Sequence, residues 1–522
     1  MDKSRTQYSI LNILTGVVGY FINTAVGFAC RIIFVRCLSV DYLGINGLFS
    51  NVLSMLSLAE LGIGSAIGFA LYKPLAEKDK EKIAQLMQFY EKAYKIIGVI
   101  VGIIGVALLP FMKVIIRETP NIRENLTIIY LLYLFNTSST YFFSYRGALL
   151  QTAQQSYIVT GLSYVQTILQ SILQIIYLLI THEYYGYLII CTIGTFLYNF
   201  SVSKVAVKKY PYIKKRNIQV LKNEERKNII SNVRDLMIYR LSGILVGCTD
   251  NIIITFFNGL SITGLTSNYT LFTGTLTSLL NQIFNGVNAS IGNHNAISNA
   301  DEQEKMFNNF NLLNYWLFGW GAIGTVCVAP DLVRLCYGKE YVISLSVPIA
   351  LALNMYMVGM QNAVWVYKNT LGIFHYGRFM QCGTAILNIV FSVVLGKRWG
   401  VFGILFASAI ARACTNTWYD PYCVYKYGFR KSSKVYFIRY VKFLLCGLLS
   451  LGFSYVVCNA ISLPIGFSIV YKIVACSFIF NIITIIVYKN TREFSFIREK
   501  TKYIWERAKY VKRFSGNKIN KI

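Results

Sequence analysis

The chain has 522 residues, of which 55% are hydrophobic and only 14% are charged, and its mean hydropathy is +0.48. A soluble protein of this length would need several domains and a far more highly charged surface. Apolar runs of roughly 20 residues, the length that crosses a bilayer as a helix, recur along the whole chain. The composition therefore excludes a soluble protein and predicts an all-α integral membrane protein.

The net charge of +28 would suit a nucleic-acid-binding protein, but the basic residues lie between the apolar runs. Membrane topology places Lys and Arg in such loops, so we expect no nucleic-acid partner. The 12 cysteines include no C-x-x-C pair and fall mostly within apolar runs. We interpret them as small packing residues and expect neither a metal site nor a disulfide framework.

The first apolar run, residues 10–35, is too long for the core of a signal peptide and lacks a small-residue cleavage site. We therefore predict that it is retained as the first of about 14 membrane-spanning helices. In chain order, the expected spans are 9–35, 44–72, 90–112, 125–148, 156–181, 185–206, 232–257, 263–292, 309–330, 343–367, 377–396, 400–424, 437–460 and 464–488.

The basic residues set the expected orientation. Lys and Arg concentrate in the segments that lie inside when the N-terminus is placed in the cytoplasm, as cytoplasmic loops usually show. The inside clusters are Lys73–Lys82, Lys204–Lys227, Lys426–Lys442 and the tail after Lys489. We therefore expect a multi-pass protein with both termini in the cytoplasm.

An internal repeat relates the two halves of the chain. RIIFVRCLSVDYLGINGLF (Arg31–Phe49) aligns without gaps on NIIITFFNGLSITGLTSNY (Asn251–Tyr269), and Gly44 falls on Gly264. Spans 1–6 and 7–12 are thus interpreted as two copies of one six-helix unit. Because six is even, both copies enter the membrane from the same side, and we expect an axis along the membrane normal.

This repeat gives the expected domain organisation. The tail Thr491–Phe514 is expected to lie on the inner leaflet as an amphipathic helix, since Phe494, Ile497, Ile504, Ala508 and Val511 share one helical face. In order, we predict an N-lobe at 1–207, a basic cytoplasmic linker at 208–231, a C-lobe at 232–425, two extra spans at 426–489 and a basic tail at 490–522.

Three ionisable residues lie deepest in the predicted spans: Glu60, Asp250 and Arg412. A charge within the hydrocarbon is costly unless it faces protein, water or a partner charge. One interpretation is that they line a polar cavity, where Glu60 and Asp250 could bind a coupling ion. The other is that they form buried charge pairs that fix helix packing.

A second group of cations lies nearer the ends of the spans. Arg146, Arg240, Lys368 and Arg378 are toward the cytoplasmic ends, and Arg31 is toward the outer end of the first span. Each taken alone could be a residue that extends to the membrane surface. Together they would form a positive path for phosphate, which arginine binds with two parallel hydrogen bonds.

Enzymatic chemistry has little support in the sequence. No G-x-x-x-x-G-K-[ST] loop occurs, which argues against nucleotide hydrolysis by that route. The chain has three histidines, and the expected outer loops are too short to hold an active site. We therefore expect a protein that is not an enzyme and has no cofactor or metal.

Two stretches carry a resemblance to a known family. RIIFVRCLSVDYLGINGLFSNVLSMLSLAELGIGSAIGFALYKPLAEKDKEKI (Arg31–Ile83) resembles the opening of bacterial polysaccharide flippases of the Wzx type. TDNIIITFFNGLSITGLTSNYTLF (Thr249–Phe272) resembles the matching stretch of their second half. The family belongs to one superfamily with multidrug exporters and peptidoglycan lipid flippases. The resemblance implies two six-helix lobes in a V.

The resemblance also implies a function. Such proteins move an undecaprenyl-pyrophosphate-linked oligosaccharide across the bacterial inner membrane for capsule, lipopolysaccharide O-antigen or exopolysaccharide synthesis. Alternating access of the lobes, a cationic lumen and coupling to H⁺ or Na⁺ are implied, with a polymerase and glycosyltransferases as partners. Arg31 and Asp250 match the family's patterned arginine and aspartate.

Three alternatives stay open at this point. A cation-coupled exporter of drugs or metabolites would favour acids and aromatic residues in its cavity, whereas the excess here is basic. A peptidoglycan lipid flippase would also have 14 spans. A membrane enzyme of envelope sugar assembly is the rival from another functional class.

Overall fold

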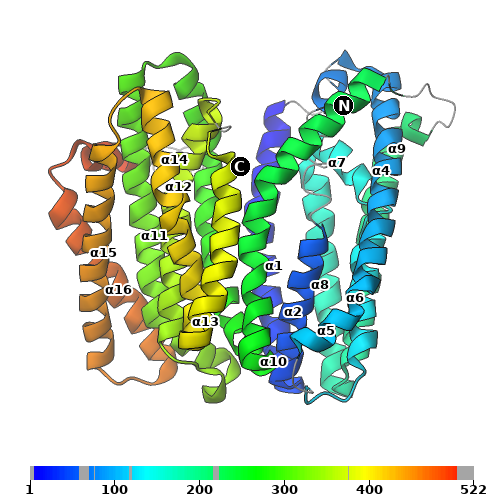
Figure 1. The fold of residues 1–522 in the computed structure, drawn as a ribbon, viewed down its shortest axis with the longest axis horizontal. Helices are drawn as coiled ribbons and strands as arrows, with labels where there is room; N and C mark the ends of the chain where they lie inside the picture. The colour runs from blue at the N-terminus through cyan, green and yellow to red at the C-terminus, as the bar shows by residue number, and fades with distance from the viewer. Residues whose placement is uncertain are drawn as a thin grey trace, which may run out of the picture. The chain divides into compact units, whose positions relative to one another are not determined.

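The computed structural model describes residues 5–502 apart from 58–69, 76, 117–119, 154, 215–220, 222 and 374–375 (Figure 1). Within these ranges the regular secondary structure is helical, and no β-strand occurs. The predicted all-α class is confirmed.

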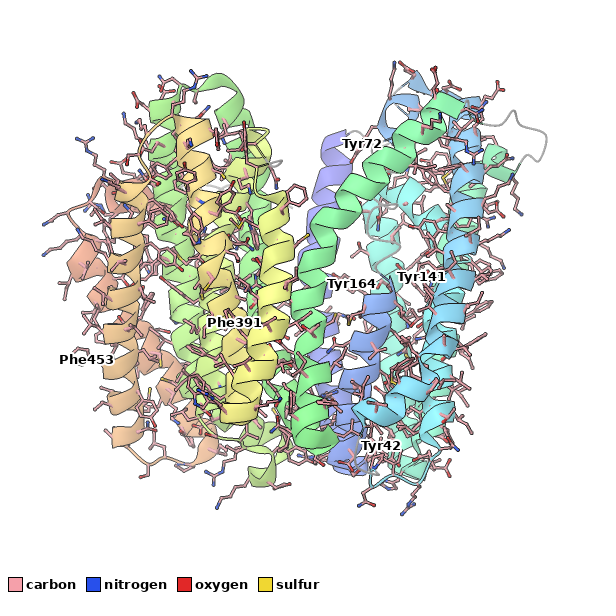
Figure 2. The ribbon with its side chains drawn as sticks, in the orientation of Figure 1. Tyr42, Tyr72, Tyr141, Tyr164, Phe391 and Phe453 are labelled. Carbon is pink, nitrogen blue, oxygen red and sulfur yellow. The ribbon has the colours of Figure 1, made fainter. Side chains whose placement is uncertain are left out.

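Eight helical segments of the described chain are long and apolar enough to cross a membrane. They are Gly19–Cys37, Ser156–Thr181, Tyr184–Lys209, Ala300–Tyr337, Ser346–Thr370, Phe379–Phe429, Lys434–Ala460 and Ile465–Tyr488. Large apolar side chains on these helices are exposed, such as Phe453, which is 61% exposed and points away from the helix bundle (Figure 2). Lipid accepts such surfaces, whereas water does not. The chain is therefore a multi-pass membrane protein.

The chain folds into two compact units. Unit 1 consists of residues 1–267 and 392–404, and unit 2 of residues 268–391 and 405–522. The predicted lobes at 1–207 and 232–425 are a different division and stay a prediction.

Unit 1 is a helical bundle in which α1 packs on α8, α8 and α6 pack on α9, and α4 packs on α6. Its elements are α1 (Arg5–Cys37), α2 (Val40–Leu56), α4 (Lys80–Ala107), α5 (Leu109–Ile115), α6 (Leu126–Thr140), α7 (Tyr145–Thr152), α8 (Ser156–Thr181), α9 (Tyr184–Lys209), the 3₁₀ turn η2 (Pro211–Lys214) and the first part of α10 (Asn223–Ile297).

Unit 2 is built around α11, which packs against α12, α15 and α16 (Figure 1). Its elements are the rest of α10, α11 (Ala300–Tyr337), the 3₁₀ turn η3 (Lys339–Tyr341), α12 (Ser346–Thr370), most of α13 (Arg378–Cys414), α14 (Asn416–Cys423), the π-helical turn η4 (Val424–Phe429), α15 (Lys434–Ala460) and α16 (Ile465–Tyr488). An apolar cluster that includes Tyr315, Phe443 and Phe480 forms the contact between these helices.

Two glycines turn the chain sharply inside the long helices. Gly259 in α10 has φ 84° and ψ 171°, and Gly400 in α13 has φ 57° and ψ −139°. These angles belong to a backbone region that is open essentially to glycine alone. Successive helices are therefore joined at these points through a glycine, where the sequence predicted short loops.

The linker is shorter than predicted because α10 begins at Asn223 and not near residue 232. Glu224 and Glu225 occupy its first turn, where acidic side chains stabilise the positive end of the helix dipole. Glu225 also accepts hydrogen bonds from Lys82 Nζ at 2.5 and 2.7 Å, which fastens the start of α10 to the start of α4.

The tail begins as the predicted helix, over residues 492–502. Phe494 stacks on Trp316 with ring centroids 5.7 Å apart, and Ile497 packs against the same apolar cluster of unit 2. The first turns of the tail therefore contact protein instead of lying free on lipid. The predicted apolar positions beyond them, Ile504, Ala508 and Val511, lie outside the described residues.

Candidate functional site

Within unit 1, α2 and α10 cross at the two glycines that the sequence repeat aligns. A methyl group on Gly264 would lie 2.5 Å from the carbonyl oxygen of Val40. A methyl group on Gly44 would overlap the carbonyl of Leu260. Neither contact is tolerable, so the two glycines allow the helices to approach until their backbones touch. A shift of 220 residues (264 − 44) converts one contact into the other.

A second pair of contacts at this crossing obeys the same shift. Arg31 Nη2 donates a hydrogen bond to Ser267 Oγ at 2.7 Å. The shift carries Arg31 to Asn251 and Ser267 to Gly47, and Asn251 Nδ2 indeed lies 3.5 Å from the position of a methyl group on Gly47. Contacts of the form i to j and j to i are the signature of a two-fold axis. They support the interpretation of the repeat as two related copies.

Asp41 contacts its own counterpart in the repeat. Its Oδ1 accepts a hydrogen bond from the Ser261 hydroxyl, and the same shift relates positions 41 and 261. Its Oδ2 accepts a hydrogen bond from the backbone N–H of Asn121 at 2.7 Å. This aspartate therefore ties together α2, α10 and the connection before α6.

Two more predicted residues of unit 1 are described. Asp250 lies in the first part of α10, directly before Asn251, and is half-buried. Arg146 of α7 is also half-buried, and its Nη1 donates to Ser203 Oγ of α9 at 2.7 Å. Its guanidinium carbon lies 5.2 Å from the ring centroid of Tyr145.

In unit 2, Lys368 forms a buried ion pair that the sequence analysis missed. Its Nζ lies 2.6 Å from Asp420 Oδ1 and donates to the Tyr376 carbonyl at 2.8 Å. Lys368 is 5% exposed and Asp420 is fully buried. The available signal was an acid and a lysine at the ends of two spans that were both predicted to end in the cytoplasm. The arrangement matches the alternative in which buried charges fix helix packing.

Arg412 of α13 donates from Nε to Asn354 Oδ1 of α12 at 3.2 Å. The described cations Arg31, Arg146, Lys368 and Arg412 thus contact four different polar partners. Glu60 lies outside the described residues, as do the side chains of Arg240 and Arg378. The proposed roles of these residues in a substrate path or in ion coupling stay predictions.

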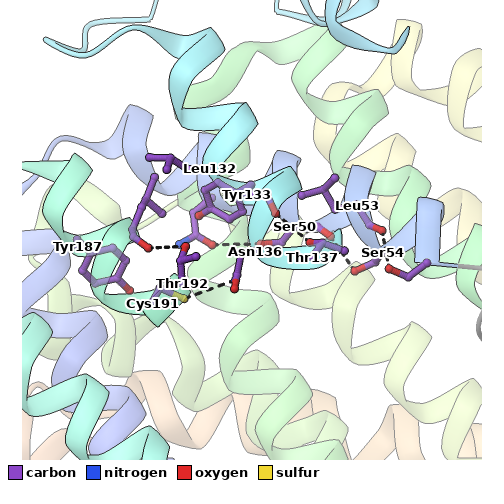
Figure 3. A pocket seen from close by; sticks show the side chains of 13 residues that line it. Ser50, Leu53, Ser54, Leu132, Tyr133, Asn136, Thr137, Tyr187, Cys191 and Thr192 are labelled. Carbon is purple, nitrogen blue, oxygen red and sulfur yellow. Dashed lines mark hydrogen bonds between the residues drawn. The ribbon is translucent and has the colours of Figure 1, made fainter. Parts of the chain in front are cut away.

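A polar pocket of about 330 Å³ lies among α2, α6 and α9 of unit 1 (Figure 3). Its lining residues are Asn46, Ser50, Leu53, Ser54 and Ser57 of α2, Leu132, Tyr133, Asn136 and Thr137 of α6, and Tyr187, Leu188, Cys191 and Thr192 of α9. None of these side chains carries a formal charge at neutral pH, and most can donate or accept hydrogen bonds.

The pocket leaves hydrogen-bonding capacity unused. Asn136 Nδ2 points at Cys191 Sγ, a weak acceptor, at 3.9 Å (Figure 3). Asn136 Oδ1 is buried and accepts no hydrogen bond from the described part of the chain. An unsatisfied buried acceptor costs about 1–3 kcal/mol, and a ligand hydroxyl would remove that cost.

Sequence reasoning concentrated on charges and therefore missed this pocket. A signal was present, because Asn46, Ser50 and Ser54 are spaced by four and form a polar stripe along one face of α2. Neutral polar residues inside apolar helices usually hydrogen-bond across helices, so the stripe alone does not distinguish a pocket from helix packing.

An apolar groove of about 490 Å³ lies elsewhere in unit 1. It is lined by Ile115, Ile252, Ile253, Phe256, Phe257, Val393 and Lys397. Lys397 supplies one positive charge to a wall that is otherwise aliphatic and aromatic. Such a combination suits an amphiphile with an apolar chain and an anionic group.

Solved structures with this fold are lipid and multidrug transporters. The lipid II flippase MurJ, in an inward closed conformation, matches with a TM-score of 0.68 and 15% identity over 92% of this chain and 99% of its own. An inward-facing multidrug resistance MATE family transporter of the MOP superfamily gives 0.56 and 15%, over 75% and 92%. The Vibrio cholerae MATE transporter VcmN gives 0.52 and 12%, over 83% and 99%.

No protein-family model and no curated protein sequence matches the chain. The structural similarities therefore establish the fold. This chain has the fold of the MurJ and MATE transporters, which agrees with the superfamily that the sequence resemblance indicated.

Proposed function

We propose that this protein is a Wzx-type flippase of the bacterial inner membrane. It moves an undecaprenyl-pyrophosphate-linked oligosaccharide from the inner to the outer leaflet for capsule, O-antigen or exopolysaccharide synthesis. The observation that carries the proposal is the polar pocket, a neutral hydrogen-bonding cavity inside a protein with a lipid-transporter fold.

The pocket chemistry suits sugars. Sugar hydroxyls both donate and accept hydrogen bonds, as do the amides and hydroxyls of Asn46, Asn136 and Thr192. A headgroup of this kind cannot cross hydrocarbon unaided, because its polar groups would lose their hydration. A cationic drug would favour an acidic side chain in the pocket, and the lining offers none.

The apolar groove suits the lipid part of the same molecule. Its isoleucine and phenylalanine side chains would pack against a prenyl chain, and the Lys397 ammonium would pair with pyrophosphate. We assign the groove to the prenyl-pyrophosphate segment of the substrate. Charge complementarity supports this assignment.

The glycine crossing provides a closure for alternating access. Tight contact at Gly44 and Gly264 holds α2 against α10, and we propose that this contact is a gate that opens during each cycle. The two-fold relation means that separating one contact also separates its counterpart. We further propose that Asp250 and Glu60 couple this cycle to a gradient of H⁺ or Na⁺.

A second candidate function is transport of lipid II. It is favoured by the similarity to MurJ, which extends over 92% of this chain. Both candidates require a lipid carrier, so the sugar portion of the transported molecule separates them.

The deciding experiment deletes the gene in its native host and locates the lipid-linked oligosaccharide in each leaflet. We expect intact precursor on the cytoplasmic leaflet, loss of surface polymer and rescue by the wild-type gene. Arg412→Gln and Asp250→Asn should insert normally and fail to rescue.

Other outcomes overturn the proposal in distinct ways. Precursor that reaches the outer leaflet without being polymerised would indicate an enzyme or an assembly partner. Accumulation of lipid II with normal surface polymer would favour the second candidate. Normal polymer with increased drug sensitivity would indicate a multidrug exporter.

A further inference from the structure

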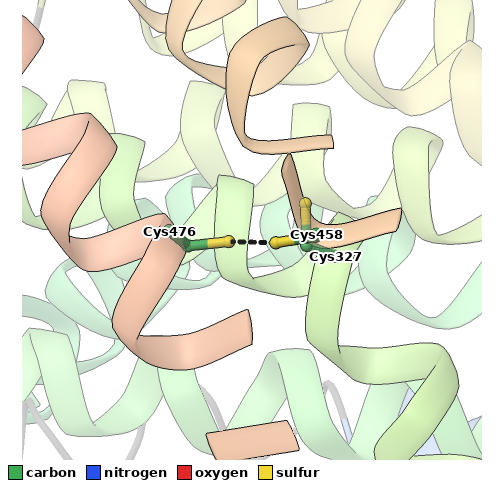
Figure 4. A group of neighbouring side chains, drawn as sticks. All are labelled: Cys327, Cys458 and Cys476. Carbon is green, nitrogen blue, oxygen red and sulfur yellow. Dashed lines mark hydrogen bonds between the residues drawn. The ribbon is translucent and has the colours of Figure 1, made fainter. Parts of the chain in front are cut away.

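Three cysteines from distant parts of the sequence meet inside unit 2. Cys327 belongs to α11, Cys458 to α15 and Cys476 to α16 (Figure 4). Their side chains are buried, at 5%, 2% and 1% exposure. All three sulfur atoms lie within 4.8 Å of one another, and those of Cys458 and Cys476 are 3.6 Å apart. The sequence analysis expected dispersed packing residues and gave no signal for this meeting.

We propose that Cys327, Cys458 and Cys476 form a binding site for a soft monovalent metal ion of the Cu(I) class. The group consists of thiols alone, and thiolate sulfur selects soft ions such as Cu(I). A structural zinc site would normally supply four ligands, and this group offers three.

The spacing of the sulfur atoms fits trigonal coordination. Metal–thiolate bonds of about 2.3 Å in a trigonal plane place the sulfurs about 4.0 Å apart. The separation of 3.6 Å between Cys458 and Cys476 is close to this value. Loading the site therefore requires displacements of a few tenths of an ångström for this pair, within the reach of side-chain torsions.

Proton balance can be written for the loading step. Cu(I) forms bonds to two sulfurs that each lose a proton, while the third thiol binds as a neutral donor. Two protons leave to solvent, and the site acquires a net charge of −1 from one cation and two thiolates. No oxidant or reductant is consumed, because the ion enters as Cu(I) and stays Cu(I).

The site has an access route at the end of a helix. Cys458 lies two residues before α15 ends at Ala460, and residues 459–464 are exposed. The last turn of a helix opens at low free-energy cost, so the thiols can be reached without unfolding the bundle. A bound ion would fasten α15 and α16 to α11.

The test titrates the purified full-length protein, in detergent and without oxygen, against the coloured Cu(I)–bicinchoninate complex. We expect the wild type to withdraw one Cu(I) per chain and its thermal midpoint to rise on loading. Cys458→Ser and Cys476→Ser should each lower the affinity at least tenfold. Cys446→Ser is the matched control, since Cys446 is also buried on α15 in the same apolar cluster but lies outside the thiol group.

Two results would overturn the proposal: no withdrawal of Cu(I) by the wild type, or equal withdrawal by the cluster variants and the wild type. X-ray absorption on the loaded wild type gives a measurement that does not depend on the folding of any variant. It should show sulfur ligands only, at about 2.2–2.3 Å. Nitrogen or oxygen in the coordination shell would place the ion elsewhere.

Discussion

The ammonium of Lys368 lies 2.6 Å from the carboxylate of Asp420, and both side chains are buried. The pair joins α12 to α14 within unit 2 and neutralises a charge that the sequence analysis assigned to a cationic path. Removing one member would leave the other charged and buried. We expect Lys368→Met to lower the free energy of unfolding by about 3–5 kcal/mol, measured by thermal or denaturant unfolding in detergent.

The double variant Lys368→Met/Asp420→Leu separates a structural role from a role in transport. Replacing both members by apolar residues should recover most of the lost stability. If the pair acts only in packing, transport by the double variant recovers together with stability. Restored stability without transport would return Lys368 to the substrate path.

The polar pocket permits a closely matched comparison on α9. Thr192 lines the pocket and donates to the Leu188 carbonyl at 2.9 Å, while Thr195 lies outside the lining and donates to the Cys191 carbonyl at 2.9 Å. Thr192→Val and Thr195→Val thus remove the same type of local hydrogen bond. We expect Thr192→Val to reduce translocation of the oligosaccharide lipid at least fivefold and Thr195→Val to leave it near wild type.

Equal effects of these two variants would show that the hydroxyls act in helix packing and that the pocket does not bind substrate. Asn136→Leu extends the test, since it removes the buried acceptor that the described structure leaves unsatisfied. Leucine of similar size should stabilise the empty protein while abolishing transport. Both quantities are measured on the same purified sample.

The gate at the glycine crossing can be locked covalently. Asp41→Cys together with Ser261→Cys places two thiols where a side-chain hydrogen bond now joins α2 to α10. We expect an oxidised double variant to lose translocation at least tenfold and to regain it after reduction. Each single variant, oxidised in the same way, controls for the native cysteines. Full transport by the cross-linked chain would contradict the gate.

The apolar groove offers a pair of neighbouring cations for comparison. Lys397 lines the groove, whereas Arg398 is exposed and lies outside its lining. Lys397→Gln should raise the KM for the lipid-linked substrate severalfold through loss of a phosphate contact. Arg398→Gln should leave the KM unchanged. Equal shifts would indicate a general electrostatic effect of the surface and remove the groove from the substrate path.

Local sequence patterns predicted much of the helical framework. The ends of α8 were predicted at residues 156 and 181, where the structure has them, because the segment is uniformly apolar and bounded by polar residues. The alignment of Gly44 on Gly264 also anticipated two positions that meet in space. Such features depend on short stretches of chain, which a sequence displays directly.

Features that depend on long-range placement were missed. Lys368 and Asp420 are 52 positions apart, and the three thiol-bearing helices are separated by longer intervals. The polar pocket requires three helices to converge, and a stripe on α2 alone does not reveal the other walls. Gly259 and Gly400 were read as parts of loops, since composition does not show which glycine adopts a positive φ.

The contact between Asp41 and Ser261 has a consequence for the ancestry of the fold. A residue that meets its own counterpart across a two-fold axis would, in a dimer of identical subunits, face an identical side chain. Two aspartates at that point would repel each other, and two serines would lack the charged acceptor. The asymmetric bond needs different residues at the two positions, so identical halves could not have formed it. It records a divergence that became possible once both copies were encoded separately in one gene.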